Sequence, residues 1–328
     1  MDGLNLINNQ YDGSALGLLS AGSASLSNIT ARINTSSNSI LSLSINSEDY
    51  INQSVDGFGE FNLINGEFTS NLSTKGSILS IGGFTQAKLE GLVFSENMAK
   101  SDIILLSSNE DRIIRNVLFK DNHADVGIDL FTLNKNSGQR QSVLIEDLQA
   151  SGNDLTSVIS VKGEIESTKF DVDLTLHMNR AIDWRNESAD YAVDAQMTNG
   201  SNFLLTVNTE ADFLTDKGIR IAKAKWADGT GTANITKTGS ACWTLGGHSD
   251  FAVDTSFSVS AGTLVLTPDA RLVWTEKVNT DKNAFTVESR AVLDVTLHDV
   301  GELDSAAHGS LAPLSLGGHG LSFADGSS

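Results

Sequence analysis

The chain has 328 residues and a formal net charge of −19. An acidic surface of this kind disfavours nucleic acid and anionic lipid as partners, because their phosphates attract Lys and Arg. The lone cysteine, Cys242, excludes an internal disulfide bond. No apolar run reaches the length of about 18 residues that a membrane-spanning helix needs.

The composition favours an all-β protein with a narrow core. Hydrophobic residues make up 40% of the chain but aromatic residues only 6%, so Val, Ile, Leu and Ala must fill most of the interior. Glycine is plentiful, which suits tight turns, and the two prolines leave the strands free to donate every N–H. The start Met1-Asp2-Gly3 lacks the basic and apolar parts of a signal peptide. We therefore expect the numbering to begin at a processed or engineered end.

Strand-like segments bounded by turn residues follow one another at about one per 10–15 residues, and helical periodicity is weak. In chain order, strands are expected at residues 16–19, 40–45, 58–64, 77–81, 89–94, 103–106, 113–119, 128–133, 142–148, 158–162, 169–176, 203–207, 219–225, 242–245, 255–259, 263–266, 272–273, 284–287 and 292–297.

Two segments, 91–108 and 116–133, repeat the same strand-turn-strand signature at an offset of 25 residues. A strand-built repeat of roughly 20–30 residues is typical of a solenoid. A fainter earlier copy includes Phe68 and Asn71. The matching pairs are Phe94 with Phe119, Asn97 with Asn122, Ala99 with Ala124, Ile103 with Ile128, and Leu105 with Leu130.

The recurring asparagines favour stacked rungs over a sandwich or barrel, which could show the same density of strands. Asn71, Asn97 and Asn122 would lie one above another at a turn, where side-chain amides can hydrogen-bond up a ladder. The alternative is three ordinary turn asparagines. Two segments interrupt the rung rhythm, the polar stretch 134–141 and the longer stretch 177–191. Insertions of this kind become loops on one face of a solenoid, often the binding face.

From about residue 235 the chain reads ITKTGSACWTLGGHSDFAVDTSFSVSAGTLVLTPDARLVW. This segment resembles the passenger-associated repeat of type V (classical) autotransporters: a Lys-Thr-Gly start, a Trp-Thr-Leu strand, a polar turn and a Ser-Ala-Gly-Thr-Leu-Val-Leu strand. The resemblance covers roughly 40 residues. The residues that carry it are Lys237, Thr238, Gly239, Trp243, Thr244, Leu245 and 261–266.

The resemblance implies a right-handed parallel β-helix with protruding loops, exported through the outer membrane to the bacterial cell surface. It implies β-helix rungs over residues 1–234 and C-terminal, autochaperone-like rungs over 235–328. Absence of disulfides fits export, because a disulfide-locked fold could not pass a narrow pore. The family's membrane β-barrel is expected to lie outside this chain, since no run of long alternating strands occurs near residue 328.

Signatures of catalysis are incomplete. Neither a Gly-Asp-Ser-Gly box nor a G-x-S-x-G elbow occurs, and no two histidines stand at zinc-ligand spacing. The triplets 279–281 (Asn-Thr-Asp) and 318–320 (Gly-His-Gly) resemble polygalacturonase motifs, but the Asp-Asp pair that would complete them is missing. Carboxylates that could hold calcium in a lyase are Asp171 and Asp173 on one strand, and Asp121, Asp125 and Asp129 in sequence. We expect solvated carboxylates, no enzyme, no metal and no cofactor.

Binding is the more economical function, because a β-helix offers long flat faces and loops. Aromatic rings stack on sugars, and Arg pairs with sulfates or carboxylates. We expect candidate contacts in the 177–191 segment, in the densest basic stretch and in the polar 134–141 segment. They are Arg180, Trp184 and Arg185; Lys217, Arg220, Lys223 and Lys225; and Lys135 and Arg140. The competing interpretations are that the lysines blunt a strand edge and that Trp184 anchors its loop to the core.

Three functions follow in order. The first is a surface adhesin that binds host extracellular matrix, either glycosaminoglycan-like glycans or matrix proteins such as fibronectin, and so promotes colonisation. The second is self-association with copies on neighbouring cells, leading to aggregation and biofilm, through rows of Asn, Ser, Thr and Asp along one face. The third is a polysaccharide lyase or hydrolase.

Overall fold

The computed structural model describes residues 1–19, 23–44, 59–107, 111–132, 140–163, 171–185, 188–198, 200–224, 231–275, 283–295, 314–315 and 320–327. Every regular element within these ranges is a β-strand, and all the strand pairs are parallel. Among the described residues, no helix is long and apolar enough to cross a membrane. The chain therefore has the all-β, parallel β-helix architecture that the sequence predicts.

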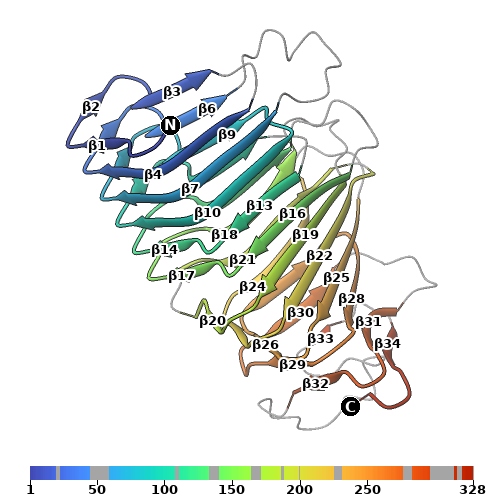
Figure 1. The fold of residues 1–328 in the computed structure, drawn as a ribbon. Helices are drawn as coiled ribbons and strands as arrows, with labels where there is room; N and C mark the ends of the chain where they lie inside the picture. Colours follow the sequence, from blue (N-terminus) through green and yellow to red (C-terminus); the bar gives the residue numbers. More distant parts are fainter. Residues whose placement is uncertain are drawn as a thin grey trace.

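Each turn of the solenoid contributes one strand to each of three faces, and the termini lie at opposite ends of the stack (Figure 1). The first face, sheet A, runs through β1 (Asn5–Ile7), β4 (Ala24–Arg32), β7 (Glu60–Thr69), β10 (Gln86–Ser95), β13 (Asp111–Arg115), β16 (Arg140–Glu146), β19 (Asp171–Met178), β22 (Asn202–Thr209), β25 (Thr232–Thr238), β28 (Asp254–Val259), β31 (Asn283–Val287) and β34 (Gly320–Phe323).

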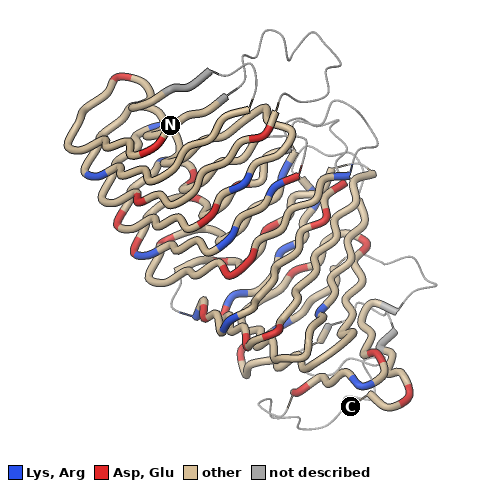
Figure 2. The backbone as a smooth tube through the Cα atoms, viewed as in Figure 1, with Lys and Arg blue, Asp and Glu red and all other residues tan. Residues whose placement is uncertain are grey.

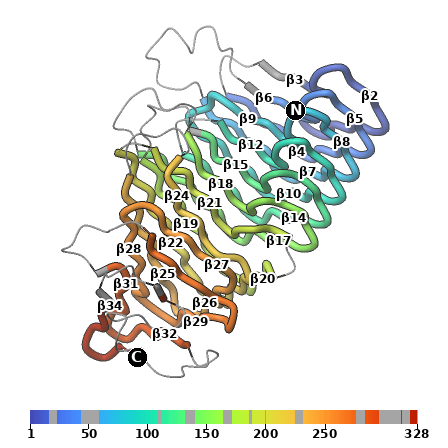
Figure 3. The backbone as a smooth tube through the Cα atoms, turned by 180° about the vertical axis from the view of Figure 1, so that it is seen from behind, coloured from blue at the N-terminus to red at the C-terminus, as the bar shows by residue number. Residues whose placement is uncertain are grey.

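The opposite face, sheet C, is seen from behind in Figure 3. It runs through β3 (Leu16–Leu19), β6 (Leu41–Ser44), β9 (Leu79–Gly82), β12 (Asp102–Ser107), β15 (Val126–Thr132), β18 (Ser157–Gly163), β21 (Tyr191–Met197), β24 (Gly218–Lys223), β27 (His248–Phe251), β30 (Arg271–Trp274) and β33 (Leu314–Ser315).

The third, narrow face is built in two parts. Sheet B contains β2 (Gln10–Tyr11), β5 (Thr35–Ser36), β8 (Leu72–Ser73) and β11 (Met98–Ala99). Next come β14 (Leu118–Lys120) and β17 (Gln149–Ser151), which pair with each other, and β14 also pairs with β10 of sheet A. Sheet D then contains β20 (Ile182–Asp183), β23 (Phe213–Thr215), β26 (Cys242–Leu245), β29 (Thr263–Leu266) and β32 (Val292–Asp294).

The register confirms the first half of the sequence repeat and corrects the second. Phe94 pairs with both Phe68 and Phe119, as the repeat predicts. Ile128, however, pairs with Ile104 rather than with Ile103. The turn before β15 is therefore one residue shorter than the turn before β12. A shift of one residue reverses the faces of a strand, so Ile104 is the inward residue that stacks on Ile128.

The asparagine ladder predicted from the sequence is present and longer than expected. Asn34, Asn71, Asn97, Asn122 and Asn153 are buried one above another, and each Nδ2 donates to the Oδ1 of the next over 2.8–2.9 Å. Each Nδ2 also donates to a main-chain carbonyl of a preceding rung. Because both amide protons and the carbonyl oxygen of the inner members are used, the ladder satisfies its buried polar groups.

The residue before each ladder asparagine turns the chain from sheet A onto the narrow face. All six of these residues have positive φ, in the left-handed region that glycine and asparagine tolerate best. Five are polar or glycine, and the exception is Ile33 at φ 56°. They are Asn8, Ile33, Ser70, Glu96, Asp121 and Gly152.

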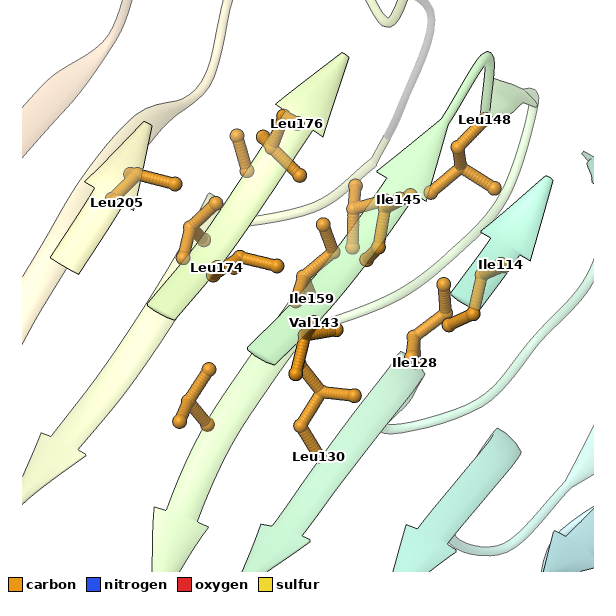
Figure 4. Close-up of a cluster of buried hydrophobic side chains, with 14 of the residues drawn as sticks. Ile114, Ile128, Leu130, Val143, Ile145, Leu148, Ile159, Leu174, Leu176 and Leu205 are labelled. Atoms are coloured by element: carbon orange, nitrogen blue, oxygen red, sulfur yellow. The ribbon is translucent and has the colours of Figure 1, made fainter. Parts of the chain in front are cut away.

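The core is a continuous column of aliphatic side chains between sheets A and C. Figure 4 shows Val, Ile and Leu residues from successive rungs meeting there, among them Ile128, Ile145, Ile159, Leu174 and Leu205, all of them buried. Aromatic rings reinforce the column in two stacks. The first joins Phe68, Phe94 and Phe119, and the second runs through Trp184, Phe213, Trp243, Phe257 and Phe285.

The division expected between residues 234 and 235 falls inside β25, and sheet A passes through it without a break. The architecture changes earlier, where the asparagine ladder ends at Asn153 and sheet D begins at Ile182. The second aromatic stack starts at the same level, with Trp184.

The Lys-Thr-Gly motif builds a turn. Lys237 is fully buried, and its Nζ donates to the carbonyls of Thr238, Gly239 and Ala261 over 2.7, 3.0 and 2.9 Å. Burial lowers the pKa of Lys237 to about 8, so the ammonium keeps at pH 7 the three protons that these carbonyls accept. Gly239 has φ 79°, and a Cβ there would lie 2.4 Å from Thr209 O. The motif is therefore structural.

Candidate binding surface

The outer face of sheet A changes character along the solenoid. In β22 and β25 every second side chain points outward, and none of these eight is charged. We call this group, with the two serines that follow in β28, the polar zone. It consists of Asn202, Leu204, Thr206, Asn208, Thr232, Asn234, Thr236, Thr238, Ser256 and Ser258.

Side chains of the polar zone are hydrogen-bonded from one rung to the next. Thr232 Oγ1 donates to Asn202 Oδ1 over 2.7 Å, and Ser256 Oγ donates to Asn234 Oδ1 over 2.5 Å. Ser258 Oγ donates to Thr236 Oγ1 over 3.2 Å. These bonds fix rotamers before any partner arrives, which lowers the entropic cost of binding.

The zone is also periodic. Thr175, Thr206, Thr236, Ser258 and Thr286 occupy one row, each in register with the next. Neighbouring strands are spaced about 4.8 Å apart, so the row presents one hydroxyl at every such step. A flat array of donors and acceptors at a constant repeat suits a partner with the same repeat.

Charged residues dominate the other half of this face, where basic and acidic side chains alternate (Figure 2). Arg115 Nε lies 3.0 Å from Glu146 Oε2, and Lys88 Nζ lies 2.6 Å from Glu90 Oε2. These pairs neutralise one another locally. The described part of sheet A therefore carries no continuous basic strip.

The structure separates the three candidate contacts of the 177–191 segment. Trp184 is fully buried, its Nε1 donates to Leu148 O over 3.0 Å, and its ring packs edge-on against Phe213. The prediction that Trp184 contacts a ligand is therefore wrong, because the ring belongs to the core. Arg180 and Arg185 are half-exposed at its two sides.

Both of these arginines already bind carboxylates or carbonyls of the protein. Arg180 Nη2 donates to Asp147 O over 3.2 Å. Arg185 forms a bidentate pair with Asp183, at 2.9 and 2.7 Å, and these hydrogen bonds lower the pKa of Asp183. The segment itself is not one loop: its ends belong to β19 and β21, and β20 lies between them.

The basic stretch after residue 216 is likewise largely paired. Arg220 donates two hydrogen bonds to the buried Asp194 and lies over the ring of Tyr191, 4.7 Å from its centroid. Lys217 Nζ is 3.6 Å from Asp216 Oδ1. Lys223 is exposed and makes no ion pair with the residues that the structure describes. Lys225 lies outside the described residues.

The 134–141 segment lies mostly outside the described residues, and so does Lys135. Arg140, by contrast, is the first residue of β16, and its Nε donates to Asp173 Oδ1 over 2.6 Å. The described candidates therefore spread over three parts of the surface, and most have an acidic partner.

The carboxylates considered for a lyase do not form a calcium site. Asp173 is held by Arg140, while Asp121 and Asp125 lie in exposed turns. Asp129 is buried and pairs with Lys162 over 2.6 Å. The triplets at 279–281 and 318–320 fall wholly or mainly outside the described residues.

Comparison of the chain with protein-family models found no match, and searches of curated proteins and of solved structures found none either. The polar zone is the surface that sequence reasoning left without residues. Its signal was the alternation Thr-x-Asn-x-Thr-x-Thr over residues 232–238, a segment that did not enter the expected strands because it is polar.

Proposed function

We propose that the protein is an adhesive passenger of the autotransporter type, displayed on a bacterial cell surface, and that it self-associates through the polar zone of sheet A. The observation that supports this most directly is the uncharged, hydrogen-bonded and periodic array on β22, β25 and β28. The resemblance of residues from about 235 onward supports the proposed class and surface location.

A second copy of this chain suits the zone for two physical reasons. It carries the same rung repeat, so contacts that form once form again on each rung, and many weak contacts add up when they are made together. The zone also lacks charge, so two copies can meet there without placing like charges in contact. The overall charge of −19 still repels at longer range, and salt screens that repulsion.

Adhesion to anionic host matrix is the second candidate, favoured by the exposed and unpaired Lys223. Most of the other candidate cations already hold a carboxylate, so a sulfated glycan would have to displace Asp183, Asp194 or Asp173. Breaking such pairs costs free energy that binding must recover. For this reason we place self-association first.

The two candidates respond to salt in opposite directions, and sedimentation velocity separates them. Self-association predicts a concentration-dependent dimer that strengthens as salt is raised. Thr236→Glu should abolish it by placing like charges at the contact, while Ser80→Glu, on the outer face of sheet C, is the matched control and should leave it intact. A chain that stays monomeric at every concentration contradicts the proposal. Binding of heparin that weakens with salt and disappears in Lys223→Glu would instead support the second candidate.

A further inference from the structure

A groove lies on the narrow face at the N-terminal end of the solenoid, far along the stack from the polar zone (Figure 3). Three successive rungs contribute to it. Its lining is one aromatic ring surrounded by polar groups: Gln10, Tyr11, Asp12, Thr35, Ser36, Ser37 and Thr74. Its volume of about 510 Å³ is within the range of roughly 300–1,000 Å³ that small-molecule sites occupy.

The register places these groups side by side. Gln10 pairs with Thr35, and Tyr11 pairs with Ser36, which pairs in turn with Ser73. Both serines are buried and small, whereas Tyr11 is only half-buried. An aromatic ring therefore occupies, in the first rung, a position that small residues occupy in the next two, and it lines the groove together with their hydroxyl-bearing neighbours.

Hydrogen bonds between the first two rungs hold the polar part of the groove in place. Ser37 Oγ accepts from Gly13 N over 2.7 Å and donates to Asp12 Oδ1 over 3.2 Å. Ser36 Oγ donates to Gly13 O, and Asn38 N donates to the same carbonyl over 3.3 Å. The carboxylate of Asp12 is exposed but anchored at one oxygen, so it can accept hydrogen bonds at a fixed place.

This combination fits an uncharged sugar ring. One face of a hexopyranose is apolar and packs on an aromatic ring, as large amphipathic side chains allow. Its rim carries hydroxyls, each a donor and an acceptor, which a carboxylate, an amide and several hydroxyls can satisfy. The only charged lining residue is Asp12, so an anionic sugar would be repelled.

We propose that this groove is a binding site for a neutral hexopyranose, with Tyr11 as the stacking residue and Asp12 as the principal hydrogen-bond acceptor. The site is separate from the polar zone and uses none of its residues. It therefore gives the adhesive protein a second, carbohydrate-directed contact, and it stands or falls independently of self-association.

Saturation-transfer NMR with the methyl glycosides of glucose, galactose, mannose and N-acetylglucosamine tests the proposal on the intact chain. We expect saturable, millimolar binding of at least one of them and none of N-acetylneuraminic acid, which is negatively charged. Tyr11→Ala should weaken binding about tenfold, because an aromatic contact contributes roughly one decade of affinity. Tyr11→Phe keeps the ring and should stay near the wild-type affinity.

Two further variants keep the test decisive if Tyr11→Ala lowers the melting temperature. Asp12→Asn should weaken binding without altering the fold, because Asp12 is exposed. Thr232→Ala, in the polar zone, should leave sugar binding unchanged. Failure of all four glycosides to bind the wild-type chain, or equal binding by Tyr11→Ala and Asp12→Asn, would overturn the proposal whatever the outcome of the sedimentation experiment.

Discussion

Asn97 Nδ2 donates to Asn122 Oδ1 over 2.9 Å, while Asn97 Oδ1 accepts from Asn71 Nδ2 over the same distance. The two bonds make Asn97 the centre of a ladder in which each side chain fills the hydrogen-bonding capacity of the next. Such a ladder fixes the register of the rungs, because a slipped rung would bury unsatisfied amides.

Replacing this residue should therefore be costly. Asn97→Ala leaves Phe68 O, Asn71 Nδ2 and Asn122 Oδ1 without their partner in the interior. We expect the free energy of unfolding to fall by about 3 kcal/mol, since each unsatisfied buried group costs roughly 1–3 kcal/mol. Urea denaturation measures it. Asn9→Ala, at the exposed end of the same ladder, should cost less than about 1 kcal/mol, and equal losses would contradict a cooperative ladder.

Ile33 stands where the other rungs place Asn, Ser, Glu, Asp or Gly. Its φ is 56°, its side chain is 60% exposed, and a β-branched residue is strained in that conformation. Ile33→Asn should stabilise the protein by about 1 kcal/mol, measured as a rise in the midpoint of thermal unfolding. Ile7→Asn is the control: Ile7 is similarly exposed but lies at the end of β1 without positive φ, so no gain is expected there.

The solenoid could be predicted because its strongest signals are local and repeated. Phe68, Phe94 and Phe119 recur with the ladder asparagines, and each pairs with the next in the structure. The register of β12 against β15 could not be predicted in the same way. Asp102, Ile103 and Ile104 are all buried, so this strand lacks the alternation that would show which residues face inward.

The candidate contacts were harder to predict, because their partners are a full rung away in the sequence. Nothing near Arg220 indicates that Asp194 neutralises it, and nothing near Arg140 points to Asp173. Trp184 stood alone in a polar segment, which is typical of a ligand contact. Its membership of the core follows from Phe213 and Trp243, which recur at the rung spacing and stack beside it.

Trp184 should accordingly matter for stability. Trp184→Phe removes the hydrogen bond to Leu148 O and leaves part of the pocket empty, so we expect a loss of about 2–3 kcal/mol. Arg185→Ala, one residue away, removes only an exposed ion pair and should change stability by less than about 1 kcal/mol. Denaturation of both variants checks this, and a larger effect for Arg185→Ala would contradict the assignment of Trp184 to the core.

Asp102 gives the protein a pH-dependent term in its stability. Burial and the neighbouring carboxylate of Asp129 raise the pKa of Asp102 to about 6, from an ordinary 3.8. The folded state therefore binds the proton more tightly than the unfolded state. The stabilisation is fully present below pH 3.8 and is lost as the pH rises through about 6.

Asp102→Asn removes the charge that becomes costly above pH 6 and keeps an oxygen that can accept from Ser101 Oγ, now 2.6 Å from the carboxylate. At pH 7 the variant should be more stable than the wild type by about 2–3 kcal/mol, and its stability should change less between pH 4 and 6.5 than that of the wild type. Ser101→Ala should shift the wild-type decline to higher pH, because the hydroxyl hydrogen bond favours the ionised form. Urea midpoints across this range measure both effects, and a wild type whose stability rises over the interval where Asp102→Asn stays level would refute the assignment.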